Sequence, residues 1–141
     1  MESVDKIFVT GATGFIGTRL VQALIERGHP VRALSRRDNP QPPPGVDLRN
    51  GNPFEHELVE LVRGDITDAD SLVAGMEGCS HVFHLAAYAK NWAPDPKIYF
   101  DMNVQAVRDV FEAARRHKVR RVVCTSTMVT FGPTPPGAKA Q

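Results

Sequence analysis

The chain has 141 residues, of which 42% are apolar and 23% are charged, as is typical of one globular domain. Its net charge of +1 gives no overall attraction to nucleic acid or to an anionic membrane. No apolar run approaches the roughly 18 residues of a membrane span, and residues 1–8 lack a signal-peptide pattern, so we expect a cytoplasmic protein without a membrane span.

The first half of the chain predicts two strands, a helix between them and an irregular crossover. Residues 6–10 ("KIFVT") form a short β-branched run that indicates a buried strand. The helix that follows has one apolar stripe and is expected to end at Gly28. A second strand is expected at residues 31–35. Residues 39–53 contain five prolines and two glycines, so we expect a loop here, with no more than a short helix near residues 55–58.

The second half predicts three more strands and two more helices. The strands are expected at residues 58–62, 81–87 and 120–126, and the helices at residues 68–78, with Asp68 or Asp70 near its cap, and 95–117. Apolar strands that alternate with helices form parallel sheets covered on both faces. The sequence therefore predicts an α/β doubly wound sheet with strand order 3-2-1-4-5. We expect one domain over residues 1–132 and an irregular tail over residues 133–141.

One basic run is a candidate nucleic-acid site, and two cysteines are candidate metal ligands. Residues 114–121 ("ARRHKVRR") have no interleaved aromatic residues, so we interpret them as the cationic end of a helix and expect no nucleic-acid partner. Cys79 and Cys124 lie in or beside apolar runs without metal-ligand spacing. We expect reduced thiols and no metal site.

Residues 10–17 read "TGATGFIG" and lie between the first predicted strand and the first predicted helix. A strand that turns directly into a helix exposes the unpaired amides of the first helical turn, and these attract anions. In this spacing Gly11 permits the tight turn, Gly14 lets a diphosphate approach the backbone, and Gly17 lets the helix pack against the strand. A plain glycine-rich turn is the alternative, but the strand-to-helix position favours a dinucleotide site.

Five stretches together resemble, in the right order, motifs of the extended short-chain dehydrogenase/reductases, the NAD(P)-dependent epimerase/dehydratase group. They are "TGATGFIG" (10–17), "GDITD" (64–68), "HLAA" (84–87), "MNV" (102–104) and "TSTMVTFG" (125–132). With "WAPDP" before the long helix, the chain most resembles the dihydroflavonol reductase-like and hopanoid-associated sugar epimerase branches. The resemblance implies a Rossmann fold and hydride transfer between a nicotinamide coenzyme and a hydroxyl or carbonyl carbon of a sugar nucleotide or a small ketone or alcohol.

The resemblance also implies roles for individual residues. The catalytic hydroxyl is expected at Thr127. The expected coenzyme-binding residues are Gly11, Thr13, Gly14, Phe15, Ile16, Gly17, Arg36, Asp65, Ile66, Leu85, Ala86, Ala87, Asn103, Thr125 and Ser126.

Several of these residues have an alternative role. Asp65, expected to accept a hydrogen bond from the adenine amino group, is otherwise a helix cap, although Asp68 suits that role better. Asn103, expected to hydrogen-bond backbone near the active site, is otherwise an exposed helix residue. Thr127 is otherwise a partner for local backbone groups. Trp92 is either a substrate contact or a packing residue.

The end of the second strand bears on the choice of coenzyme. An NAD site favours an acidic residue there, to hold the ribose hydroxyls. This chain has Ser35, Arg36 and Arg37 instead, and Asp38 comes three positions beyond the strand. A guanidinium suits a 2′-phosphate, so we expect NADP, with NAD as the alternative.

The chain departs from the family in one respect. The family's proton-transfer pair, Tyr-x-x-x-Lys, is absent, because Tyr88 and Tyr99 are followed four positions later by Trp92 and Asn103. We therefore interpret the chain as the N-terminal coenzyme-binding part of such an enzyme, and expect weak NADP(H) binding with little or no turnover. The alternative is a non-catalytic NADP-sensing or regulatory module.

The expected partners follow from the same resemblance. We expect a small-molecule substrate and, as in the family, association into a homodimer through the helix at residues 95–117. The fifth strand is expected at an edge of the sheet, which also favours self-association.

Overall fold

The fold alternates strands and helices along the whole described chain. The structure is a computed structural model that describes residues 5–48, 50–127, 132 and 136–137. In chain order the elements are β1 (Ile7–Thr10), α1 (Phe15–Glu26), β2 (Val31–Ser35), the 3-10 turn η1 (Pro53–Glu55), β3 (Val59–Arg63), α2 (Ala69–Met76), β4 (His81–His84), α3 (Lys97–Phe100), the π-helical turn η2 (Asp101–Gln105), α4 (Ala106–Arg116) and β5 (Arg121–Cys124).

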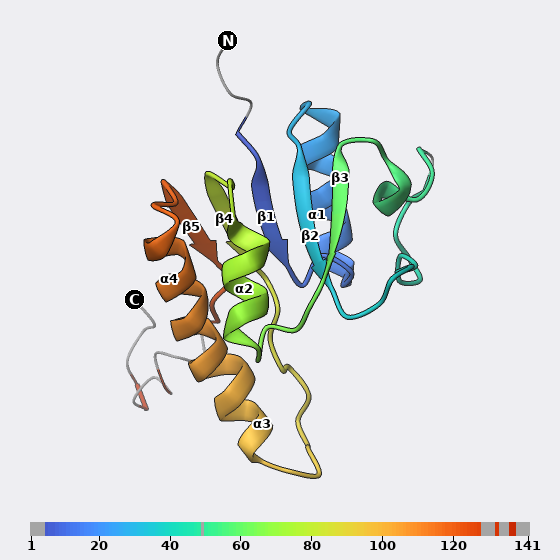
Figure 1. Cartoon of the computed structure of the whole chain (residues 1–141). Helices are drawn as coiled ribbons and strands as arrows, with labels where there is room; N and C mark the ends of the chain where they lie inside the picture. The colour runs from blue at the N-terminus through green and yellow to red at the C-terminus, as the bar shows by residue number, and fades with distance from the viewer. Residues whose placement is uncertain (1–4, 49, 128–131, 133–135, 138–141) are drawn as a thin grey trace.

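The five strands form one parallel sheet in the order β3-β2-β1-β4-β5 (Figure 1). β1 pairs with β2 from Ile7 opposite Val31, and with β4 from Ile7 opposite His81. This confirms the predicted doubly wound order, which is that of a Rossmann fold. The order reverses between β1 and β4, so the loops leaving these two strands diverge and open a crevice at their carboxyl ends.

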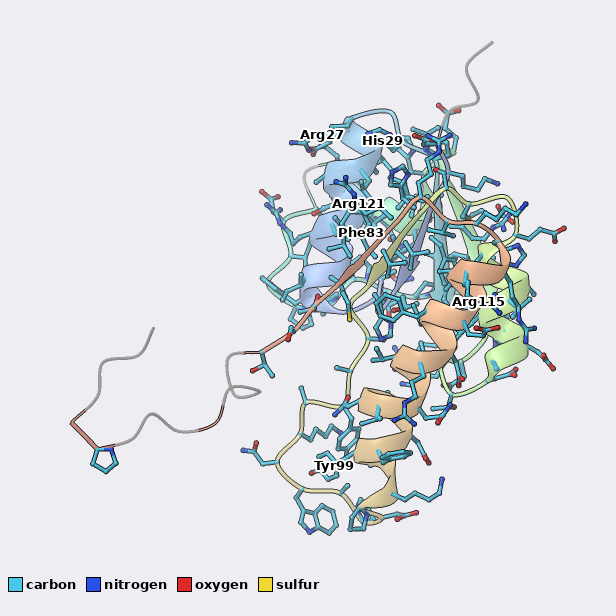
Figure 2. The ribbon with its side chains drawn as sticks, turned by 90° about the vertical axis from the view of Figure 1, so that its left-hand side faces the viewer. Arg27, His29, Phe83, Tyr99, Arg115 and Arg121 are labelled. Atoms are coloured by element: carbon cyan, nitrogen blue, oxygen red, sulfur yellow. The ribbon has the colours of Figure 1, made fainter. Side chains whose placement is uncertain are left out.

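Helices cover both faces of the sheet. Figure 2 shows the sheet edge-on, with α1 on one side and α2 and α4 on the other. The side chains of β1 alternate between the two layers: Phe8 is fully buried against α2 and α4, whereas Ile7 and Val9 are buried against α1. The apolar runs of the sequence therefore form two cores, one on each face.

The bounds of α1 follow from its sequence. Gly14 is its N-cap residue, and the helix ends at Glu26, just before the predicted stop at Gly28, which has φ +75°. The amide of Gly28 donates to the carbonyl of Ile25 (2.9 Å), and that of His29 donates to the carbonyl of Leu24 (3.0 Å). This pair of hydrogen bonds is the Schellman motif, which needs a left-handed residue where Gly28 lies.

The crossover from β2 to β3 is a loop, as the prolines predicted, and it is anchored at three places. Pro40 is fully buried, Phe54 packs in the α1 core, and the side-chain amide of Gln22 donates to the carbonyl of Asp47 (2.7 Å). The short helix expected near residues 55–58 is instead η1, where the Asn52 side chain caps the turn.

Several predicted bounds are corrected. β4 ends at His84 rather than at residue 87, and β5 spans residues 121–124 rather than 120–126. The helix expected over residues 95–117 is three segments, because a π-helical turn at residues 101–105 interrupts it. Each strand ends where the chain leaves its neighbouring strands to form the crevice. The apolar pattern of the sequence does not indicate this position, so the predicted ends of β4 and β5 were too late.

The basic run ends α4 as predicted. Arg115 and Arg116 lie in its last turn, and both pair with the carboxylate of Glu112 (2.8 and 3.3 Å). These two guanidiniums lower the pKa of Glu112 to about 2. Arg120 pairs with Asp5 (3.1 Å). No helix in the described ranges is long and apolar enough to cross a bilayer.

Candidate functional site

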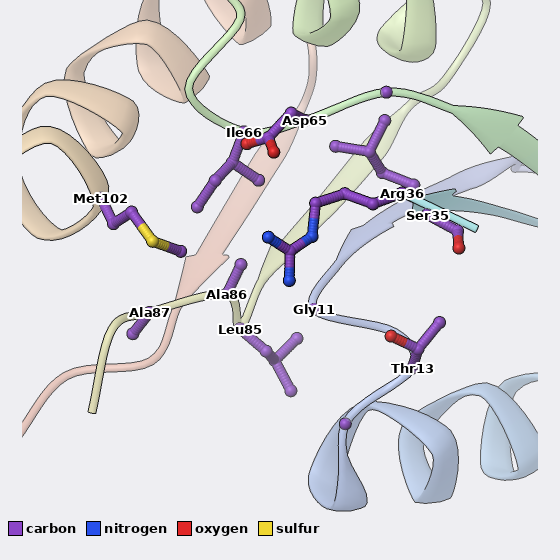
Figure 3. A pocket seen from close by; sticks show the side chains of 13 residues that line it. Gly11, Thr13, Ser35, Arg36, Asp65, Ile66, Leu85, Ala86, Ala87 and Met102 are labelled. Carbon is purple, nitrogen blue, oxygen red and sulfur yellow. The ribbon is translucent and has the colours of Figure 1, made fainter. Parts of the chain in front are cut away.

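An open pocket of about 260 Å³ lies at the carboxyl ends of β1, β2, β3 and β4, where the strand order reverses (Figure 3). It is lined by Gly11, Thr13, Gly14, Leu34, Ser35, Arg36, Gly64, Asp65, Ile66, Leu85, Ala86, Ala87 and Met102. Of these, Leu34, Ser35, Gly64 and Met102 were not among the expected coenzyme residues. Open α/β sheets bind ligands at this position.

Two of the motif's glycines are required by the fold itself. Gly11 has φ +67°, and a Cβ there would lie 2.6 Å from the amide nitrogen of Ala86. A Cβ on Gly17 would overlap the carbonyl of Gly11 and lie 2.7 Å from Cα of Ala12. Gly17 therefore lets α1 pack closely against the turn that follows β1.

Gly14 is different, because the fold has room for a side chain there. Its φ is −77°, and among the described residues a Cβ would meet only the carbonyl oxygen of Gly11, at 3.4 Å. Within the same part of the chain no side chain caps α1, and the first turn of this helix has no acidic residue. The amide end of a twelve-residue helix thus faces the pocket beside an exposed, side-chain-free position. An anionic diphosphate fits such a surface.

Phe15 and Ile16 follow Gly14 as the first residues of α1. Their side chains are 56% and 65% exposed and do not line the pocket. Their amides belong to the first helical turn. Large exposed apolar side chains next to a pocket are typical of a surface that a ligand covers.

Arg36, at the end of β2, places a positive charge in the pocket. Figure 3 shows the guanidinium of Arg36 extended over the space between Gly11 and Asp65. Ser35 shapes this turn, because its hydroxyl accepts a hydrogen bond from the amide of Arg37 (3.0 Å) and donates to the carbonyl of the same residue (2.7 Å). Asp38 does not line the pocket and pairs with Arg63 of β3 (2.6 Å).

The end of β3 brings a carboxylate. Asp65 lines the pocket, and its Oδ1 accepts hydrogen bonds from the amide (3.0 Å) and hydroxyl (2.9 Å) of Thr67. The cap of α2 is Asp68, whose carboxylate accepts from the amide of Asp70 (3.1 Å) and the hydroxyl of Ser71 (2.7 Å). Both hydrogen bonds lower the pKa of Asp68, and the one from Ser71 has the larger effect. Asp65 is therefore not the helix cap.

The end of β4 forms the pocket wall opposite Arg36. Leu85 still pairs with β1, since its amide donates to the carbonyl of Thr10 (3.2 Å), and the amide of Ala86 donates to the Thr10 hydroxyl (3.4 Å). That hydroxyl also lies 2.6 Å from Nδ1 of His84. His84 is 2% exposed and burial lowers its pKa. The buried pair of Thr10 and His84 thus fixes the segment against which Gly11 packs.

The long helix contributes through its π-helical turn. Met102 lines the pocket, and the next residue, Asn103, holds the loop after β4. The Asn103 side chain accepts from the amide of Tyr88 (2.8 Å) and donates to its carbonyl (3.0 Å). The predicted hydrogen bonding of Asn103 to backbone beside the site is confirmed, although Asn103 itself does not line the pocket.

The loop after β4 is held firmly and exposes its tryptophan. The hydroxyls of Tyr88 and Tyr99 donate to the carbonyls of Trp92 (3.1 Å) and Lys90 (2.9 Å), and the two rings meet edge to face at 5.1 Å. Figure 2 shows Tyr99 between α3 and this loop. Trp92 is 73% exposed, so it does not pack in the core of the described residues.

Beyond β5, Thr125 continues the pairing with β4 through its amide, which donates to the carbonyl of His84 (3.0 Å). Thr125, Ser126 and Thr127 are all exposed, and none of them lines the pocket. Most of the tail predicted for residues 133–141 lies outside the described residues. Within the described ranges, no three His, Cys, Asp or Glu side chains come together as a metal site.

Comparisons with known proteins point to one family. The sequence model of the NAD dependent epimerase/dehydratase family matches residues 7–141. A dihydroflavonol 4-reductase-like protein of Synechocystis sp. is 36% identical over an alignment of 140 residues, and the match covers 96% of this chain and 36% of that protein. Sterol demethylase protein B of Methylococcus capsulatus is 39% identical over 130 residues, which are 92% of this chain and 37% of that protein.

The solved structures agree with the sequences. MoeE5, in complex with UDP-glucose and NAD, is similar with a TM-score of 0.70 and 33% identity, over 92% of this chain and 39% of that one. The chain thus spans 36–39% of the length of these three proteins. By its matched sequence model, its strand order and the pocket at the reversal of that order, the chain belongs to the NAD-dependent epimerase/dehydratase family.

Proposed function

We propose that this chain forms the coenzyme-binding part of an oxidoreductase or epimerase/dehydratase, with NADP as the preferred dinucleotide. The main observation behind this proposal is the amide end of α1, which no described side chain caps and where Gly14 leaves space. It lies in a pocket that Arg36 and Asp65 also line. Family membership supports a nicotinamide dinucleotide as the ligand, and MoeE5 was solved with NAD. When bound, this group supplies hydride transfer, and the residues of the chain position it.

Each pocket wall has a role in this proposal. The α1 amides and Gly14 hold the diphosphate, Asp65 accepts from the adenine amino group, and Leu85 with Ala86 and Ala87 supports the nicotinamide end. Thr127 is proposed as the hydroxyl that hydrogen-bonds the reacting oxygen of a small alcohol, ketone or sugar-nucleotide substrate. Proton transfer would need a Tyr-x-x-x-Lys pair, which these 141 residues do not contain.

The preference for NADP is argued from the turn after β2. Arg36 extends over the pocket, and a planar guanidinium can bind a 2′-phosphate through two parallel hydrogen bonds. The residue at the end of β2, where an acidic side chain would hold ribose hydroxyls, is Ser35, and its hydroxyl is already bonded to the backbone of Arg37.

A binding titration with NADPH and NADH tests both parts of the proposal. Gly14→Asp places a carboxylate at the N-cap of α1, where it accepts from the free amides and repels the diphosphate. Because Gly14 has room for a side chain, we expect unchanged or higher thermal stability, and binding of both coenzymes weaker by about tenfold or more. Gln41→Glu, with the same change of charge in an exposed loop, is the control.

Arg36→Asp tests the choice of coenzyme in the same titration. The ratio of NADPH to NADH affinity is expected to fall by about tenfold, because a guanidinium is replaced by a carboxylate that accepts from ribose hydroxyls. Unchanged affinity in Gly14→Asp would refute the coenzyme site, whereas an unchanged ratio in Arg36→Asp would refute only the preference.

A regulatory NADP-binding module is the alternative on the same fold. The proposed enzyme differs from it by the Tyr-x-x-x-Lys pair, so turnover by a protein that contains this chain and such a pair would favour the enzyme.

The two free cysteines, Cys79 and Cys124, suit a reducing compartment such as the cytoplasm, which is the location we propose.

We also propose that the protein forms a homodimer through the long helix. Phe100, Val104 and Phe111 are 51%, 36% and 49% exposed. All three lie on the helical segment that α3, η2 and α4 form. Large exposed apolar side chains gathered on one segment are typical of an interaction surface.

A further inference from the structure

The turn that carries Arg36 is fixed at both of its ends. At its start, the Ser35 hydroxyl bonds the amide and carbonyl of Arg37, and the amide of Gly64 donates to the carbonyl of Ser35 (3.0 Å). At its far end, Nη1 of Arg63 lies 2.6 Å from Oδ1 of Asp38. Arg63 is the last residue of β3, the outer strand of the sheet.

The ion pair with Arg63 holds the Asp38 carboxylate of this turn next to β3. Asp38 is the first carboxylate after β2, two residues beyond Arg36. It pairs with β3 and is not part of the pocket wall, whereas Arg36 is. Without Arg63, the Asp38 side chain, which is 83% exposed, has no other recorded cation to hold it among the described residues. Its carboxylate would then be free to turn toward Arg36 and toward the ribose.

We propose that Arg63 is a positioning residue for coenzyme selectivity, which it exerts by holding Asp38 away from the place of a 2′-phosphate. The inference rests on the proposed function. A carboxylate released near Arg36 would compete with the 2′-phosphate for the guanidinium and repel it. The same carboxylate would accept hydrogen bonds from the hydroxyls of an unphosphorylated ribose. Loss of Arg63 therefore weakens NADPH binding and spares or strengthens NADH binding.

Arg63 could also bind the 2′-phosphate directly, because its own positive charge attracts a phosphate. Removing the Asp38 carboxylate together with Arg63 distinguishes this direct contact from the positioning role. If Arg63 acts through Asp38, the double variant Arg63→Met with Asp38→Asn has no carboxylate to release and recovers its selectivity. If Arg63 contacts the phosphate itself, the double variant is as impaired as the single one.

The experiment measures dissociation constants of NADPH and NADH for the parent chain and for the variants R63M, R63K, D38N and R63M/D38N. Circular dichroism and thermal melting verify that each variant is folded. We expect the NADPH-to-NADH affinity ratio to fall about three- to tenfold in R63M, the range of an exposed ion pair and a nearby like charge. R63K, which retains the ion pair, and R63M/D38N are expected to keep the parent ratio.

The outcomes separate this inference from the proposed function. A parent chain that prefers NADPH, with an unchanged ratio in R63M, overturns the inference alone. A ratio in R63M/D38N as low as in R63M also overturns it and assigns Arg63 a direct contact. A parent chain that binds neither coenzyme overturns the proposed function, and the inference with it.

Discussion

At the scale of single residues, His84 is a buried histidine whose pKa is shifted by burial. One ring nitrogen lies 2.6 Å from the Thr10 hydroxyl, and the other, Nε2, has no hydrogen-bond partner in the described structure. Burial disfavours the charged form and lowers the pKa of the imidazole below the ordinary 6.5. His84 therefore stays neutral in the folded protein under conditions where it is protonated in the unfolded chain.

We expect this difference to make stability fall as the pH falls below 6.5. In that range the unfolded chain binds a proton that the folded chain does not, so the free energy of unfolding decreases, by at most about 1.4 kcal/mol per pH unit. Urea denaturation between pH 7 and pH 5 measures this slope. In His84→Gln the slope is expected to be smaller, because the other histidines contribute equally to both proteins.

Glu60 and Asp68 contribute little to the slope between pH 7 and pH 5. Their pKa values are lowered from 4.5 and 3.8, so the stability that they contribute is lost only at more acidic pH. Equal slopes for the parent and His84→Gln between pH 7 and pH 5 would show that His84 does not stay neutral in the folded state.

Residue roles were predictable where the backbone itself imposes them. Gly11 and Gly17 could be identified from the sequence because a strand that turns into a helix excludes side chains at these positions. Ser35 and Gly64 were missed as pocket residues, because they reach the pocket only through the pairing of β2 with β3. Neither residue is part of a local pattern that indicates a ligand.

At the scale of elements, α1 and α4 end in the same motif with different residues. The amides of Lys118 and Val119 donate to the carbonyls of Arg115 (3.2 Å) and Ala114 (2.9 Å), which repeats the two hydrogen bonds at the end of α1. In α1 the left-handed position is held by Gly28, but in α4 it is held by Lys118, with φ 53°. A residue with a Cβ is strained in this conformation.

Lys118→Gly is therefore expected to stabilise the protein by about 0.5–1 kcal/mol, since the relief of strain exceeds the added freedom of the unfolded chain. Gly28→Ala is the matched control. Its Cβ meets nothing within 4 Å, so the conformation alone is tested, and a loss of similar size is expected. Urea denaturation measures both changes. A Lys118→Gly protein that is less stable than the parent would contradict the prediction.

The order of elements was predictable because alternating apolar runs and a proline-rich loop are local signals. The π-helical turn was not, since Ile98, Met102 and Val110 keep an ordinary helical spacing in the sequence. The resemblance to the family predicted that Asn103 bonds to backbone, but the identity of its partner, Tyr88, depends on how the loop after β4 folds.

At the scale of the whole molecule, the exposed apolar side chains of the long helix, Phe100, Val104 and Phe111, are expected to govern association. Phe111→Lys places a charge in the proposed interface and should raise the dissociation constant of the dimer by about tenfold or more, as for a central apolar contact. Ala74→Lys adds the same charge at an exposed position of α2 and serves as the control. Sedimentation velocity over a range of concentrations measures the effect.

Two results would contradict the proposed dimer. One is a parent chain that stays monomeric at every concentration tested. The other is an Ala74→Lys protein that dissociates as readily as Phe111→Lys, which would indicate that net charge rather than the exposed apolar residues controls association.

The π-helical turn lies where the long helix borders both the pocket and the core. An added residue shifts the angular position of everything after it by about 100° relative to an unbroken α-helix. Ala106, Val110 and Ala113 face the core, and Met102, one turn earlier, packs against the same core and also borders the pocket. Shortening this segment by a single residue would rotate one surface out of place, so its length is as constrained as its composition.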